Sequence, residues 1–222
     1  GGAMALAAGL LALRTAGVSF MIVTLMFAQA FALTLLYFNS WTGGDEGFVI
    51  PATARNLFGL SLSADTPRFV IAWAMFAIGL LAALALVRSR FGRVMVALRE
   101  NEERARMLGI NPFAAKLRVL VISGFYAGAA GAAYALLFGY AGASFAGTQY
   151  SILPMLYVLL GGAGTVLGGV LGAGLMFYLT EFASSLTDAW MFVIGAVLVG
   201  LVLFAPKGIL GWLRGKFWRG LP

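Results

Sequence analysis

The sequence predicts an all-α, polytopic membrane protein, and three observations lead to that fold class. The 222-residue chain is 62% hydrophobic and only 10% charged, whereas a soluble domain carries about 25% charged residues. Four long stretches contain no Asp, Glu, Lys or Arg: 15–44, 69–87, 119–180 and 189–206. About 20 such residues cross a bilayer as a helix, so the longest stretch must cross more than once.

The distribution of basic residues is the third observation, and it also orients the chain. Most Lys and Arg residues lie in 88–118 and 207–219, while 39–68 holds three acids and two arginines. Cytoplasmic loops of membrane proteins are enriched in Lys and Arg. We therefore expect 88–118 to be a cytoplasmic loop, 207–222 a cytoplasmic tail and 39–68 an external loop. Topology accounts for the net charge of +7, so no nucleic acid partner is expected.

The first membrane segments follow from this orientation. Residues 1–13 form the end of a span, with Arg14 at its cytoplasmic exit; residues 17–38 cross outward and 69–87 return. The chain starts Gly-Gly-Ala-Met, and no basic leader typical of a signal peptide precedes its short first apolar run. We expect a fragment that lacks amino-terminal spans of a longer protein.

The cytoplasmic loop is predicted to be helical. Residues 92–108 are good helix formers, Gly109 is placed as a left-handed C-cap, and Asn111-Pro112 supplies an N-cap followed by proline in the first turn of a new helix. Such a helix would be amphipathic and lie at the membrane surface. Its apolar face would hold Val94, Leu98, Ala105 and Leu108.

Two interpretations of this loop are open. It is either a solvated basic loop that only fixes topology, or a docking face for a soluble protein. Topology needs only Lys and Arg, yet Glu100, Glu102 and Glu103 stand among the arginines. The mixed signs favour docking.

The region 119–206 reads at first as three spans, at 119–141, 152–180 and 189–205. Three spans would leave the basic tail outside, against the positive-inside rule. The glycine-rich stretch 159–174, "LLGGAGTVLGGVLGAG", can break the middle run into two short spans or half-helices. We therefore expect about seven membrane segments in all, including broken or short helices.

Glycines recur at intervals of four in two places, at Gly164, Gly168 and Gly172 and at Gly124 and Gly128. Small residues at this interval let helices in lipid approach closely. A compatible alternative is that the break at 161–169 lines the translocation path. The same stretch is not a phosphate-binding loop, because no Gly-Lys-Ser/Thr follows it.

Other charged and aromatic residues carry weaker predictions. Asp45 and Glu46 belong to a turn by composition, or else face a partner or the substrate entrance. Glu181 and Asp188 flank the last outer turn as solvated residues, although a buried carboxylate would be a proton-relay candidate. The tail carries an interfacial anchor of Trp212 and Trp218 among basic residues. Without Cys or His, the chain offers no thiol or imidazole for catalysis or metal binding.

Four motifs follow one another along the chain. The longest is "GRVMVALRENEERARMLGINPFAAKLRVLVISGFYAGAAGAAYA", which resembles the cytoplasmic loop and following span of the LivM-type permease family of branched-chain amino acid ABC importers. The others are "VSFMIVTLMFAQAFALTLLYFNSWTGGDEG", "LLGGAGTVLGGVLGA" and "LFAPKGILG". They cover nearly the whole chain.

The resemblance implies a transport subunit that catalyses no reaction itself. It implies a second permease subunit, two ATPase subunits that bind ATP and Mg²⁺, and a periplasmic substrate-binding protein, with no cofactor in this chain. In such importers the loop between two spans forms a coupling helix that sits in a groove of the ATPase. Here that element would be 93–110, with the contact carried by Arg99, Glu100, Asn101, Glu102, Ala105, Gly109 and Ile110.

A substrate path is expected where polar or unwound positions lie at membrane depth: Thr24, Phe27, Gly162, Gly164 and Thr165. The expected substrate is Leu, Ile or Val, imported across the inner membrane by alternating access; urea, short amides and aromatic compounds are alternatives. An ion-coupled carrier would need ionisable residues within its spans, and a membrane enzyme paired acids or a His cluster. A purely structural scaffold is the remaining alternative.

Overall fold

Ten α-helices account for most of the residues that the structure describes. The computed structural model describes residues 1–44, 46–51, 53, 55–57, 60–62, 64–187, 189–204, 208 and 210–211. The chain divides into two units, Gly1–Thr148 and Gln149–Pro222, which are treated separately below. Among the predictions above, those for Asp45, Asp188, Trp212 and Trp218 lie outside the described residues.

Within the described residues, four helices are long and apolar enough to cross a membrane: α2 (Val18–Tyr37), α4 (Asp65–Arg88), α7 (Pro112–Phe138) and α9 (Val166–Leu186). The shorter apolar helices α1 (Gly2–Ala12), α8 (Thr148–Gly161) and α10 (Trp190–Phe204) accompany them. These helices confirm the predicted class, a polytopic helical membrane protein. Two spans begin earlier than predicted, α4 at Asp65 and α7 at Pro112, because a helix can continue past the hydrocarbon boundary into the polar interface.

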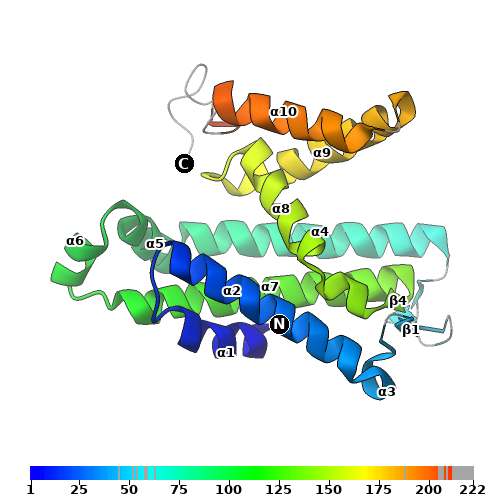
Figure 1. Cartoon of the computed structure of the whole chain (residues 1–222), viewed down its shortest axis with the longest axis horizontal. Helices are drawn as coiled ribbons and strands as arrows, with labels where there is room; N and C mark the ends of the chain where they lie inside the picture. The colour runs from blue at the N-terminus through cyan, green and yellow to red at the C-terminus, as the bar shows by residue number, and fades with distance from the viewer. Residues whose placement is uncertain are drawn as a thin grey trace. The chain divides into compact units, whose positions relative to one another are not determined.

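In the first unit, α1 packs along α7 through small residues (Figure 1). A methyl group added at Gly124 would collide with the Cβ of Ala5, and one added at Gly128 would lie 3.0 Å from the Cα of Gly1. Gly124 and Gly128 therefore allow the close approach that their spacing predicted.

The segment between α2 and α4 contains short elements: α3 (Asn39–Thr42), β1 (Phe48–Val49), β2 (Asn56–Leu57) and β3 (Leu60–Ser61). β2 and β3 pair with each other, antiparallel. β1 pairs antiparallel with β4 (Tyr140–Ala141), which follows α7 directly, and the amide of Ile50 donates to the carbonyl of Gly139 at 2.8 Å. The carboxyl end of α7 is thus hydrogen-bonded to the segment between α2 and α4. A 3₁₀ turn, η2 (Ala143–Ala146), follows and packs against α2.

The second unit contains the predicted break in the glycine-rich stretch. α8 ends at Gly161 and α9 starts at Val166. Gly162 has φ +120°, a conformation that favours glycine, and the Thr165 hydroxyl caps α9 by accepting from the amide of Gly168 at 3.1 Å. Leu160, Met176 and Ile194 join α8, α9 and α10 in one apolar cluster.

Three glycines bring α8 and α9 together. A methyl group at Gly161 would collide with the carbonyl of Gly168, and one at Gly172 would collide with the carbonyl of Tyr157. The packing interpretation is confirmed for Gly168 and Gly172. It is wrong for Gly164, where a methyl group would meet nothing within 4 Å; this residue belongs to the turn and not to the helix contact.

Candidate functional site: the α5–α6 elbow

The loop between α4 and α7 forms two short helices, α5 (Arg90–Glu100) and α6 (Glu102–Met107). Figure 1 shows them at one end of α4 and α7, away from β1 and β4. We call residues 90–111 the elbow. The helix predicted over 92–108 is interrupted at Asn101, so that part of the prediction is wrong.

Local chemistry explains the interruption. Asn101 is extended, with φ −159° and ψ 110°, and its side chain accepts from the amide of Arg104 at 2.9 Å. Asn is among the preferred N-cap residues. The negative charges of Glu102 and Glu103 stabilise the partly positive amino-terminal end of α6. The sequence Asn-Glu-Glu therefore stops α5 and starts α6 at the same residue.

The other helix ends in the elbow are fixed by capping side chains and by one glycine. Ser89 caps α5 by accepting from the amide of Gly92 at 3.3 Å, and a methyl group at Gly92 would collide with the carbonyl of Val87. Gly109 has φ +79°, and the amide of Ile110 donates to the carbonyl of Ala105 at 3.1 Å. This is the Schellman end that glycine permits. Asn111 then caps α7 by accepting from Ala114, with Pro112 at its start, as predicted.

A small apolar core holds the elbow together. Leu98, Ala105 and Ala115 are buried in it, and Val94, Met95 and Ile110 pack around them. Leu108, predicted on the same face, is instead 78% exposed. The break at Asn101 changes the direction of the helix, so residues beyond it do not continue the face of α5.

Glu102 ties α6 to its neighbours. Its carboxylate accepts from the Lys116 ammonium at 2.5 Å and from the Arg106 guanidinium at 3.1 Å. The hydrogen bond from Lys116 lowers the pKa of Glu102, against an opposing effect of burial. Lys116 lies on α7, so one carboxylate links both helices. Sequence spacing could not reveal a contact across fourteen positions.

The predicted ATPase-contact residues separate into two groups. Arg99, Glu100, Asn101 and Gly109 are exposed, whereas Ala105 is 1% exposed and Ile110 is half-buried. In this structure Ala105 and Ile110 pack against the core of the elbow, and Ala105 does not contribute to an outer surface. Glu102 is partly exposed but engaged in ion pairs.

Sequence reasoning missed the apolar tip of the elbow. Met107 and Leu108 are 84% and 78% exposed, next to the chain reversal at Gly109. Large apolar side chains this exposed at the tip of a polar loop are typical of an interaction site. The available signal was an apolar pair directly before a glycine cap, in a segment otherwise charged.

The predicted substrate-path residues fall in both units. In α2, the Thr24 hydroxyl donates to the carbonyls of Phe20 and Met21, and Phe27 is 38% exposed. In the second unit, Gly162, Gly164 and Thr165 form the turn between α8 and α9 described above. A further polar pair was missed: the Thr148 hydroxyl donates to Gln29, near the midpoint of α2, at 3.2 Å.

We expect Asn101→Ala to loosen α6 from the rest of the elbow. Removing this N-cap costs about 1 kcal/mol and takes away the signal that separates α6 from α5. Hydrogen exchange of the amides of residues 102–107 should then be about fivefold faster. Asn101→Ser, which keeps a capping oxygen, should exchange at the wild-type rate. Equal rates in Asn101→Ala and wild type would contradict the capping role.

Glu102 makes elbow stability depend on pH. Because the folded pKa lies below the ordinary 4.5, the stabilisation is complete above that value and is lost as pH falls through the folded pKa. The partners are exposed, so the contribution is about 1 kcal/mol or less and weakens with salt. As the pH is lowered from 5, the hydrogen-exchange rate of the α6 amides, corrected for intrinsic rates, should increase in wild type and not in Glu102→Gln. A Glu102→Gln profile that parallels wild type would exclude this origin.

Comparison with known proteins identifies the family. The family described as "Branched-chain amino acid transport system / permease component" matches residues 1–202. The chain is 30% identical to the high-affinity branched-chain amino acid transport system permease protein LivM of Escherichia coli K12, over 96% of the chain and 56% of the relative. It is 28% identical to LivM of Salmonella typhimurium LT2, over 91% and 53%.

A second group of relatives carries another name. The chain is 31% identical to the autoinducer 2 import system permease protein LsrC of Salmonella paratyphi B, over 74% of the chain and 49% of the relative. No solved structure matches the chain significantly. The chain spans about half the length of the curated relatives it matches.

The helices and the comparisons agree on what kind of protein this is. Four span-length helices and the similarity to bacterial permeases place the chain in the inner membrane. Three of the four motifs that suggested LivM-type permeases lie within residues 1–202, and the resemblance is confirmed. The chain belongs to the family of permease components of branched-chain amino acid transport systems.

Proposed function

We propose that this chain is the permease part of an ATP-driven importer that moves Leu, Ile or Val inward by alternating access. It works with a second permease subunit, two ATPase subunits that bind ATP and Mg²⁺, and a periplasmic binding protein. Family membership over residues 1–202 is the observation that carries the proposal. The names of the LivM relatives support the choice of substrate.

The elbow supports a mechanism for coupling to the ATPase. α5 and α6 are short, capped at Ser89 and Asn101, and packed on the start of α7. The exposed pair Met107 and Leu108 would enter an apolar groove of the ATPase, surrounded by charged side chains that set orientation. Arg99, Glu100 and Arg104 are exposed charged residues of the elbow that would take that surrounding role.

Reconstitution tests the proposal. The complete importer in vesicles should accumulate radiolabelled leucine only with ATP and the binding protein, and an uncoupler should not stop it. Uptake that continues without ATP and collapses with the uncoupler would instead show an ion-coupled carrier. Arg99→Glu is a better probe of docking than a charge reversal at Glu102. Glu102 forms two ion pairs within the chain, whereas Arg99 forms none in the described part of it.

Import of another small solute is the second candidate, favoured by the similarity to LsrC. The same vesicles distinguish the two. Competition of labelled leucine uptake by unlabelled isoleucine and valine supports the first candidate. ATP-dependent accumulation of autoinducer 2, urea or a short amide, without leucine uptake, supports the second.

A further inference from the structure

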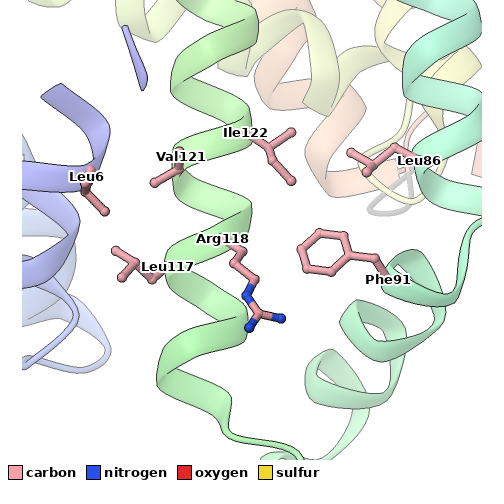
Figure 2. A pocket seen from close by; sticks show the side chains of 7 residues that line it. All are labelled: Leu6, Leu86, Phe91, Leu117, Arg118, Val121 and Ile122. Carbon is pink, nitrogen blue, oxygen red and sulfur yellow. The ribbon is translucent and has the colours of Figure 1, made fainter. Parts of the chain in front are cut away.

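An apolar cavity of about 350 Å³ lies across the face of α7 near its start. Figure 2 shows Leu6 of α1 on one side of α7, and Leu86 of α4 and Phe91 of α5 on the other. Val121 and the side chain of Arg118 lie between them. Arg118 is the only charged residue in this lining. The cavity is therefore apolar, with the guanidinium of Arg118 at its edge.

A second cavity, of about 290 Å³, adjoins the first on the elbow side. Phe91 and Arg118 line both cavities, and the backbone turn at Gly109, Ile110 and Asn111 lines the second. Its lining also contains no acidic residue. The lining of the first cavity is apolar and that of the second is more polar, and Arg118 belongs to both.

Three arginines at or near this site are unpaired among the described residues. Arg118 forms no ion pair among the described residues, and neither do Arg88 and Arg90, which lie within two positions of the lining residues Leu86 and Phe91. An exposed arginine beside an apolar cavity presents a guanidinium that binds phosphate oxygens well.

The site lies near one end of each of two span-length helices, α4 and α7. Leu86 is in the last turn of the span-length helix α4, and Arg118 is about 9 Å along α7 from Pro112, at 1.5 Å per residue. Both positions are at the helix ends joined to the basic loop 88–118, the cytoplasmic side by the positive-inside rule.

We propose that the two adjoining cavities together form a groove that binds an anionic phospholipid of the cytoplasmic leaflet. One acyl chain occupies the apolar cavity, and the phosphate meets Arg118 beside the turn at Gly109–Asn111. A soluble anion has no acyl chain to fill the apolar cavity. A neutral lipid carries no net negative charge for Arg118 to attract. Basic pockets between membrane helices on the cytoplasmic side bind such headgroups.

The test is lipid retention by the purified full chain in mild detergent, measured by native mass spectrometry with phosphatidylglycerol and phosphatidylcholine. Wild type should retain phosphatidylglycerol about fivefold better, the effect of roughly one interfacial arginine. Arg118→Gln should abolish that preference. Arg14→Gln, which removes an exposed arginine at the cytoplasmic end of α1, should keep it. Val121→Trp, which fills the apolar cavity, should lower retention of both lipids while the fold, checked by circular dichroism, is unchanged.

Several results would overturn the proposal. Equal retention of both lipids by wild type, or equal losses in Arg14→Gln and Arg118→Gln, would show only diffuse attraction to a charged surface. Glycerophosphate alone competing as well as the lipid would make this an anion site without a chain. Displacement of the lipid by millimolar leucine would assign the groove to substrate.

Discussion

Gly172→Ala is expected to lower the Tm of the detergent-solubilised protein by about 5–10 °C. The added methyl group would collide with the carbonyl oxygen of Tyr157, and backbone cannot move aside as a flexible side chain can. Overpacking of this kind costs about 2–3 kcal/mol. The change should also separate α8 from α9 and weaken the cluster of Leu160, Met176 and Ile194.

The same helix offers a matched control. At Gly174 an added methyl group would meet nothing within 4 Å, and alanine is the better helix former by about 0.5–1 kcal/mol. Gly174→Ala should therefore leave the Tm unchanged or raise it slightly. If both variants melt together, the close approach of α8 and α9 is not what these glycines provide.

Changing Met107 and Leu108 together to serine is expected to reduce ATP-dependent uptake by at least about tenfold without changing the fold. Both side chains are more than three-quarters exposed, so their removal costs the isolated chain little. The few anchor residues that dominate an interface each carry about 2 kcal/mol or more of binding energy. Co-purification of the ATPase subunits, together with uptake in vesicles, measures the loss.

The control for the tip keeps its apolar volume. Met107→Leu with Leu108→Met exchanges the two side chains and should retain most uptake, since volume-conserving apolar exchanges are well tolerated. Wild-type uptake and ATPase recovery in the double serine variant would rule out the tip as the contact. Charged neighbours such as Arg99 would then have to carry it.

Local signals made much of the fold predictable. The uncharged runs gave α2 and α4, and Gly109 and Asn111-Pro112 marked the end of α6 and the start of α7, because caps and left-handed glycines act within a few residues. The break between α8 and α9 was predictable from glycine content and from charge topology. The close helix approach at Gly124 and Gly128 was predictable from their spacing, but their partner α1 was not.

The errors in the elbow come from one residue and its consequences. Asn101 carried a cap signal, with two glutamates after it, but the helix-forming residues around it suggested continuity. Once α6 turns away, Leu108 leaves the predicted face and Ala105 packs inward. The Glu102–Lys116 ion pair depends on that turn, so no local pattern encodes it. The substrate-path residues depend on how helices assemble around a pore, which periodicity does not specify.

α7 is unbroken over Pro112–Phe138, a length of about 40 Å at 1.5 Å per residue. Its first turns hold the Glu102 ion pair and the elbow core, and its last residue leads directly into the strand that pairs with Phe48 and Val49. No flexible joint interrupts it. A tilt imposed at the elbow must therefore reach the end that pairs with Phe48 and Val49 as the movement of a single stiff rod.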